Sequence, residues 1–190
     1  MFDPKMLDAY FGWGEFANRV AFDSADAAAM AFGNKYYSTS RYIRHEFGAD
    51  IYSVPLKGDG KLFFLGPTLI GSPHGVGPIG ESMKKYREWV TTEAFVHTHP
   101  NLSGFSRTDI RESVTLEINF YVVGPNLHMR HFDWENRDDT YVGTVGLRYL
   151  DLQYREELQR NFRSTWVNHI CGVANCGNTP WPTPPRQIWR

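Results

Sequence analysis

Residues 93–110, EAFVHTHPNLSGFSRTDI, organise the rest of this chain. The apolar run over 94–96 predicts a β-strand that leads directly into His97 and His99. Because side chains alternate between the two faces of a strand, these two imidazoles point the same way, about 7 Å apart along the strand. Pro100 has no N–H to give to a sheet and ends the strand. This arrangement makes the two histidines a candidate pair of metal ligands.

The second half of this stretch predicts the start of a helix. After a polar loop over residues 101–104, Ser106 is followed three residues later by Asp109, which is the pattern of a helix N-cap. In the first turn of that helix, Asp109 can face back toward the two histidines. Two neutral imidazoles, one carboxylate and an open fourth position are the ligand set of a catalytic zinc site. We therefore expect His97, His99 and Asp109 to bind Zn²⁺.

The sequence HTHP at 97–100, followed by SRTD at 106–109, resembles the JAMM (JAB/MPN) metallopeptidase motif. The resemblance implies that the two histidines and the aspartate hold zinc, that Ser106 helps to stabilise the oxyanion, and that an upstream glutamate handles the proton of the water. Six residues separate His99 from Ser106, one fewer than the commonest eukaryotic spacing. The shorter loop suggests a bacterial branch of the family.

A broader resemblance covers residues 22–132. FDSADAAA from residue 22, EFGADIY from residue 46 and the HTHP block are similar to a bacterial family of unknown function. Its members often form C-terminal toxin domains of Rhs and other polymorphic secreted proteins. The resemblance implies a secreted effector, made in the bacterial cytoplasm and delivered into a target cell, with a secretion carrier and an immunity protein as expected partners.

Glu46 is the position that matches the catalytic glutamate of the resembled family. It lies in the segment 43–54, whose aromatic and β-branched residues favour a strand. A carboxylate beside a metal-bound water can take its proton and pass it to a leaving amine. Glu93 and Glu81 compete for this assignment, and Glu93 shares the face of His97 if the strand extends that far. We rank Glu46 first and Glu93 second.

Length, composition and net charge limit the classes of protein to which this chain can belong. The chain has 190 residues, 42% hydrophobic and 22% charged, as expected for a soluble globular protein. A net charge of -1 gives no general basic surface for nucleic acid. No apolar run approaches the roughly 18 residues of a membrane span, and the first residues lack the pattern of a secretory signal. We expect a protein or peptide substrate, and neither nucleic acid nor membrane as a partner.

The whole chain, 1–190, is expected to form one domain. Within it we expect an N-terminal packing arm over 1–23, a catalytic core over 24–150, a C-terminal helix over 151–170 and a proline-rich tail over 171–190.

The predicted fold is α/β in the layered α+β sense, a mixed and mostly antiparallel sheet flanked by helices that begin near Ser24, Ser106 and Tyr154. The resemblance implies a JAMM or cytidine-deaminase type of sheet. Gly33-Asn34 is expected to stop the first helix. Hairpin turns are expected at 57–61 and 124–126, a short helix over 81–90 and a polar loop over 133–140.

Two other features leave alternatives open. The Gly- and Pro-rich loop 66–80 is expected to border the substrate cleft, and His74 in it is either a substrate contact or, as we favour, an ordinary loop histidine. Cys171 and Cys176 could form a small-loop disulfide or remain thiols, and with His169 they are weak evidence for a second metal site.

The leading functional hypothesis is a zinc-dependent hydrolase of peptide or isopeptide bonds. A zinc deaminase would require a Pro-Cys-x-x-Cys sequence, which this chain lacks. A metal-dependent phosphoesterase would typically require more His and Asp ligands. The alternatives kept are a JAMM-like module that binds a partner without catalysis, and a zinc hydrolase or deaminase that acts on a non-peptide substrate. Relatives of the binding kind have usually lost a ligand, whereas this chain keeps the full set.

Overall fold

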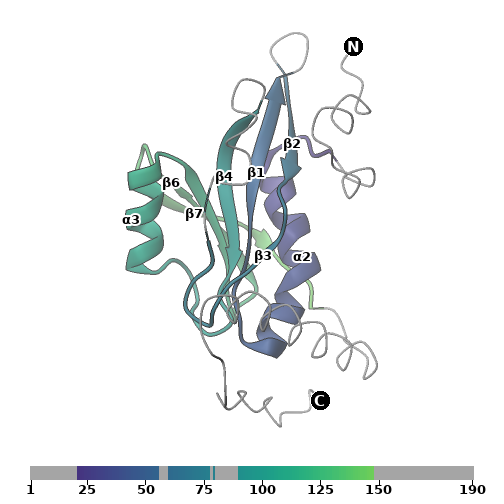
Figure 1. The fold of residues 1–190 in the computed structure, drawn as a ribbon, viewed down its shortest axis with the longest axis vertical. Coiled ribbons are helices and arrows are strands. Elements are labelled where there is room, and N and C mark those ends of the chain that lie inside the picture. Colours follow the sequence, from purple (N-terminus) through teal and green to yellow (C-terminus); the bar gives the residue numbers. More distant parts are fainter. Residues whose placement is uncertain (1–20, 56–59, 78, 80–89, 148–190) are drawn as a thin grey trace, which may run out of the picture. The chain divides into compact units, whose positions relative to one another are not determined.

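The computed structural model describes residues 21–55, 60–77, 79 and 90–147 (Figure 1). These residues form one mixed sheet of seven strands with two helices, which confirms the predicted α+β fold class. Several predicted features lie outside the described residues: residues 1–20 of the N-terminal arm, the helix from Tyr154, the proline-rich tail and the two cysteines. The same holds for all of the predicted helix 81–90 except Val90, and for residues 57–59 of the predicted turn 57–61. In chain order the elements are α2 (Ala25–Ile43), β1 (Phe47–Pro55), β2 (Lys61–Leu65), β3 (Leu69–Ile70), β4 (Thr91–Thr98), α3 (Arg107–Leu116), β5 (Asn119–Val123), β6 (His128–Asp133) and β7 (Asp138–Thr144).

The strands are ordered β2-β1-β4-β5-β6-β7, and β3 also pairs with β1. Every pairing is antiparallel except that of β4 with β5. Parallel neighbours need a crossover connection, and α3 supplies it between β4 and β5. The chain therefore leaves the carboxyl end of β4 and enters α3 beside it, which brings the two halves of the 93–110 stretch together.

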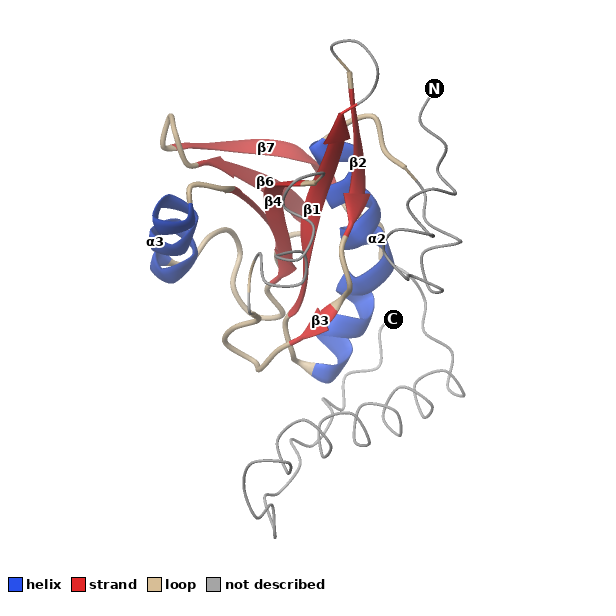
Figure 2. Cartoon of the chain, turned by 45° about the horizontal axis from the view of Figure 1, so that its top comes forward, coloured by secondary structure: helices blue, strands red, loops and turns tan. Residues whose placement is uncertain are grey.

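The two helices lie on opposite faces of the sheet (Figure 2). On one face the apolar side of α2, including Phe32, packs on Ala94 and Val96 of β4. On the other face Phe95 and Phe120 pack with residues of α3 and its flanking loops. Strand alternation thus sends odd-numbered residues of β4 toward α3 and even-numbered ones toward α2. No helix of the described part of the chain is long and apolar enough to cross a membrane.

The first helix begins as predicted, with the Ser24 side chain accepting a hydrogen bond from the Ala27 N–H, but the predicted stop at Gly33-Asn34 is wrong. Helix α2 continues to Ile43. A Cβ at Gly33 would lie 2.8 Å from Met129 and 2.9 Å from Val145, so the glycine serves close packing of the helix on the sheet. Glycine costs a helix about 1 kcal/mol relative to alanine, and the close packing of α2 on the sheet outweighs this cost.

Two further boundaries differ from the prediction. The expected strand over 43–54 begins only at Phe47, because Ile43 ends α2 and Arg44 takes a left-handed conformation that turns the chain. Glu46 therefore immediately precedes β1 instead of lying within it. The expected polar loop over 133–140 is shorter than predicted and covers only 134–137, since β6 runs to Asp133 and β7 starts at Asp138. The hairpin between β5 and β6 is confirmed.

Gly48 of β1 pairs with His97 of the neighbouring strand β4, and its missing side chain leaves room for the Phe95 ring. A Cβ at this position would lie 2.4 Å from the Phe95 ring and 2.9 Å from Val76. We predict that Gly48→Ala displaces this ring and lowers the free energy of unfolding by about 1–3 kcal/mol, as overpacking of a core does. Urea denaturation measures the change. Gly75→Ala, where an added Cβ meets nothing within 4 Å, is the matched control, and equal destabilisation by both would contradict the account.

Candidate metal centre

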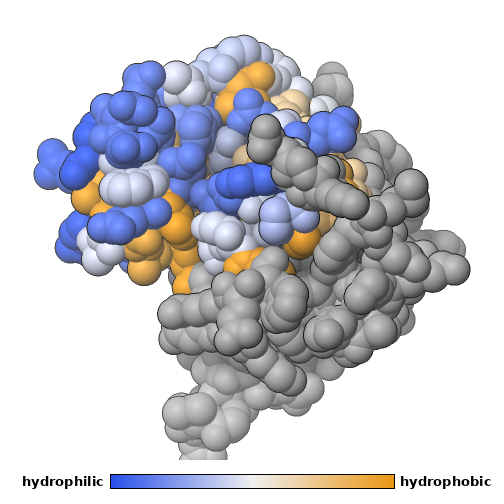
Figure 3. All heavy atoms as spheres, turned by 90° about the horizontal axis from the view of Figure 1, so that it is seen from above, coloured by the Kyte–Doolittle hydropathy of each residue, from blue (hydrophilic) through white to orange (hydrophobic). Residues whose placement is uncertain are grey.

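Hydrophilic side chains cover much of the face shown in Figure 3, with hydrophobic ones emerging between them. Such a surface is ordinary for a globular protein and does not by itself mark a site. Buried titratable side chains are more informative because burying charge is costly unless it is paired or coordinated. Several of them meet at the carboxyl end of β4.

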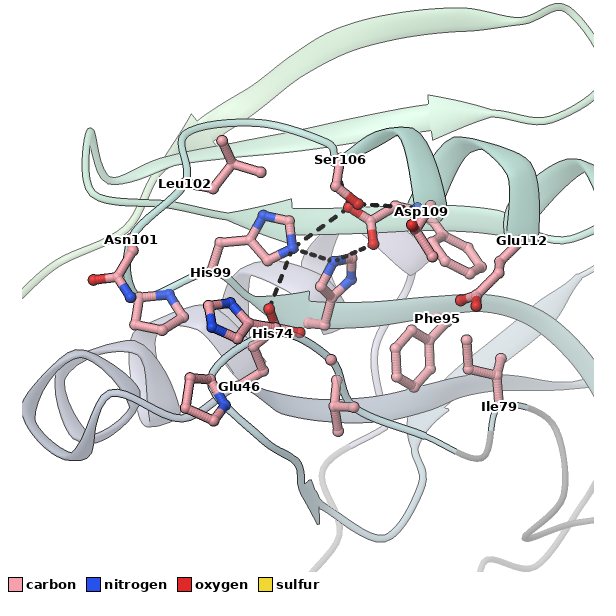
Figure 4. Close-up of a pocket in the computed structure, with 17 residues that line it drawn as sticks. Glu46, His74, Ile79, Phe95, His99, Asn101, Leu102, Ser106, Asp109 and Glu112 are labelled. Carbon is pink, nitrogen blue, oxygen red and sulfur yellow. Dashed lines mark hydrogen bonds and ion pairs between the residues drawn. The ribbon is translucent and has the colours of Figure 1, made fainter. Parts of the chain in front are cut away.

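His97, His99 and Asp109 converge there. Figure 4 labels His99 and Asp109 of this group, whose side chains point toward one another. The Nε2 atoms of the two histidines are 3.1 Å apart. Asp109 Oδ1 lies 3.5 Å from His97 Nε2, and Asp109 Oδ2 lies 3.4 Å from His99 Nε2. Bonds of about 2.0–2.2 Å to a tetrahedral zinc would place ligand atoms about 3.3–3.5 Å apart. These three residues can hold a metal ion.

A hydrogen bond fixes the tautomer of His99. Its Nδ1 lies 2.9 Å from the Gly104 carbonyl oxygen, which can only accept, so Nδ1 carries the proton. In the neutral ring Nε2 then keeps its lone pair and directs it toward the centre. An outer hydrogen bond of this kind is the usual support of a metal-binding histidine.

His97 is oriented by packing. Its ring stacks on Phe95, with centroids 5.7 Å apart, and meets Phe120 edge to face at 6.0 Å. The buried Nδ1 atom of His97 has no hydrogen-bond partner in the described residues. The two candidate ligands are therefore held differently, His99 by a backbone carbonyl and His97 by aromatic rings.

Asp109 is fixed by the N-terminus of α3. Its Oδ2 accepts a hydrogen bond of 2.6 Å from the Ser106 N–H, and its own N–H donates to Ser106 Oγ at 3.1 Å. This is a complete capping box, as predicted from the sequence. The Asp109 carboxylate thus accepts a hydrogen bond from a free N–H group at the start of α3 and also faces the two histidines.

The charges at neutral pH suit a cation. Burial, together with the neighbouring His97, lowers the pKa of His99 to about 4, so this ring is neutral near pH 7. Burial alone would raise the pKa of Asp109, but the interactions with His97, His99 and the Ser106 N–H outweigh it and lower this pKa to about 2. One neutral imidazole and one ionised carboxylate are in the protonation states that metal binding requires.

Glu46 lies next to this group and Glu93 does not. Glu46 is 6% exposed, and its Oε1 is 3.7 Å from His99 Nε2. Burial raises the pKa of Glu46 to about 7, opposed by His97 and reinforced by Asp109. Glu93 instead accepts hydrogen bonds from Ser53 and Lys61 farther back along β4. Glu81 lies outside the described residues.

No protein-family model matches this chain, and no curated protein matches it significantly. The JAMM resemblance therefore remains a prediction carried by the motif residues themselves.

A pocket of about 430 Å³ opens over the centre. Glu46, His97, His99, Ser106 and Asp109 all contribute to its wall, as does the exposed side of His74. The loop over 66–80, expected to border the cleft, contributes Pro73, Gly75, Val76 and Ile79 to the wall. Sequence reasoning missed other wall residues, among them Phe95, Phe120 and Glu112. Glu112 follows Asp109 by three residues on α3, and that helical spacing was the available signal.

The raised pKa of Glu46 has a consequence for stability. The unfolded chain loses this proton near pH 4.5, whereas the folded chain keeps it to about pH 7, so ionisation destabilises the fold increasingly between these values. In metal-depleted protein, we predict that Glu46→Gln raises the free energy of unfolding at pH 8 by up to about 3 kcal/mol and changes it little at pH 4.

Urea denaturation at both pH values measures this difference. Glu93→Gln, which removes only the partner of Lys61 and Ser53, is the control and should give no stabilisation at pH 8. Wild type and Glu46→Gln of equal stability at pH 8 would contradict the burial argument.

Proposed function

We propose that this protein is a zinc-dependent hydrolase of amide bonds. The observation that supports it most is the joint geometry of four side chains. The candidate ligand atoms of His97, His99 and Asp109 lie 3.1–3.5 Å apart, close to the separations around a tetrahedral zinc. The Glu46 carboxylate stands 3.7 Å from His99 without being a member of the group. A three-residue ligand set leaves a fourth position for water or substrate, which is what distinguishes catalytic from structural zinc sites.

Zinc fits the donors better than the common alternatives. Two imidazole nitrogens and one carboxylate oxygen are typical zinc ligands, whereas Mg²⁺ and Ca²⁺ prefer oxygen donors alone. When bound, zinc would acidify a water molecule to a pKa near 7 and polarise the scissile carbonyl.

Glu46 would act as the proton carrier. Burial raises the pKa of Glu46 to about 7 in the metal-free chain, and a bound cation would lower it toward the ionised form that accepts a proton from water. Its place on the pocket wall allows both a water and a leaving amine to reach it.

Ser106 would donate a hydrogen bond to the developing oxyanion. Its Oγ already accepts the Asp109 N–H, so its own proton is available to a substrate in the pocket. The cap holds this hydroxyl in place before substrate arrives, which is the condition under which such a donor lowers the barrier.

The pocket favours an amide over a phosphoester. Among the described lining residues, Glu46, Asp109 and Glu112 carry carboxylates and none is lysine or arginine. An anionic phosphate would gain no cationic side chain from this lining and would meet Glu112. The apolar wall formed by Val76, Ile79, Phe95 and Phe120 suits the uncharged part of a peptide or isopeptide substrate.

We also propose a biological setting for this activity. The similarity of residues 22–132 to toxin-associated bacterial domains supports a secreted effector that acts in a target cell. A secretion carrier and an immunity protein would then be its partners.

We predict that Glu46→Gln abolishes hydrolysis of a fluorogenic peptide library by the zinc-loaded protein while zinc stays bound. Ser106→Ala should lower kcat by about 10²-fold with a smaller change in KM, because its hydrogen bond is made in the transition state. Glu93→Gln is the control and should retain wild-type rates. Undiminished cleavage by Glu46→Gln would refute the proposed mechanism.

A further inference from the structure

A buried pair of hydroxyl groups lies directly behind the candidate centre. Thr98 stands between His97 and His99 in sequence, so its side chain points to the opposite face of the sheet, toward α2. There it meets Ser40 of the last turn of α2, with Oγ1 and Oγ 2.6 Å apart. Both residues are 0% exposed. Strand alternation therefore links the ligand strand to the end of α2 through two hydroxyl groups.

The directions of the hydrogen bonds around this pair are fixed. Ser40 Oγ donates its single proton to the His45 carbonyl oxygen at 2.7 Å, because a carbonyl can only accept. The Phe47 N–H donates to Thr98 Oγ1 at 2.9 Å. Thr98 must therefore donate its own proton to Ser40. Each hydroxyl accepts one bond and donates one, in a single chain that runs from Phe47 through both hydroxyls to His45.

Glu46 is the residue between the two ends of that chain. Its own N–H donates to the Ser72 carbonyl at 3.0 Å, and its own carbonyl accepts from the Gly71 N–H at 2.8 Å. The backbone on both sides of Glu46 is thus held by the hydroxyl pair, and its own backbone polar groups are held by the 71–72 loop. These hydrogen bonds on both sides of Glu46 restrict movement of its Cα.

The side chain of Glu46 needs such external support. In the described part of the chain no hydrogen bond is donated to its carboxylate, and the nearest partner, His99 Nε2, is 3.7 Å away. The side chain is only 6% exposed, and rotation or displacement toward solvent would relieve the burial of a carboxylate that accepts no hydrogen bond from the described residues. Its backbone, and not its own side-chain contacts, keeps it facing the histidines.

We propose that the Ser40–Thr98 hydroxyl pair is a positioning device that sets Glu46 against the His97 and His99 strand. The proposal rests on the hydrolase function proposed above, in which Glu46 moves the proton. Because Thr98 belongs to the same strand as both candidate ligands, any shift of that strand is transmitted to Glu46. The distance between the proton carrier and the metal ligands is thereby kept constant.

Packing alone does not account for these hydroxyls. Valine has nearly the shape of threonine, and its β-branched side chain is well suited to a strand such as β4. Alanine at position 40 would suit the α2 helix better than serine does. Valine and alanine would fill much of the same space while removing the buried hydrogen bonds to the Phe47 N–H and the His45 carbonyl. The directional bonds are what the polar residues provide.

The test compares Thr98→Val, which removes the hydroxyl and keeps the shape, with Thr98→Ser, which keeps the hydroxyl and removes a methyl. Nuclear Overhauser effects between the Glu46 γ protons and the His99 ring report the position of Glu46 in metal-free protein, without reference to activity. Hydrolysis of the fluorogenic peptide library and zinc content are then measured on the zinc-loaded forms. Ser40→Ala breaks the same series of hydrogen bonds from the α2 side, and it replaces Thr98→Val in the test if that variant does not fold.

We expect Thr98→Val to weaken these Overhauser effects and to lower kcat by about ten- to a hundredfold, with KM and zinc content near wild type. Thr98→Ser should retain the Overhauser effects and a kcat within about threefold of the wild-type value.

Unchanged Overhauser effects and an unchanged kcat in Thr98→Val and Ser40→Ala would overturn the proposal. Equal losses in Thr98→Val and Thr98→Ser would also overturn it, because the methyl group and not the hydroxyl would then matter. If wild-type protein cleaves no peptide, the proposed function fails, while the Overhauser comparison still decides whether the hydroxyl pair places Glu46.

Discussion

The hydrogen bond from the Ser106 N–H to the Asp109 carboxylate is the interaction on which the candidate site depends. It ends the loop that leaves β4, starts α3 and orients the carboxylate toward two buried imidazoles. The parallel pairing of β4 with β5 makes this geometry possible, because the crossover through α3 returns the chain beside the strand that carries His97 and His99. A common local motif, the capping box, thereby becomes part of the candidate metal centre.

Most of this arrangement could be predicted from the sequence because it is local. His97 and His99 share a face by strand alternation, and Pro100 ends the strand. Ser106 and Asp109 then indicate the start of a helix within the next few residues. Only the bend of the intervening loop had to be inferred. The fold class followed from the same reasoning, since alternating apolar runs and turn residues indicate a sheet with helices on its faces.

The errors arose where distant residues override local preference. Gly33 indicates a helix end by propensity, yet it lies in the middle of α2 because Met129 and Val145, far along the chain, pack against it. Glu46 could be selected by resemblance, but its place just before β1 depends on the turn at Arg44 and on the 71–72 loop. Likewise, nothing local to Thr98 indicates its partner, Ser40, which lies 58 residues earlier. Such long-range contacts have no periodic signal in the sequence.

The most direct test of the account is the metal content of the purified protein by mass spectrometry. We predict about one zinc ion per chain in the wild type and in Glu93→Gln, and a loss of zinc in His97→Ala and Asp109→Asn. The asparagine keeps an acceptor for the helix cap while removing the charge, so loss of zinc there would reflect ligation and not unfolding. Wild-type protein that takes up no zinc, or zinc retained in both ligand variants, would contradict the central claim.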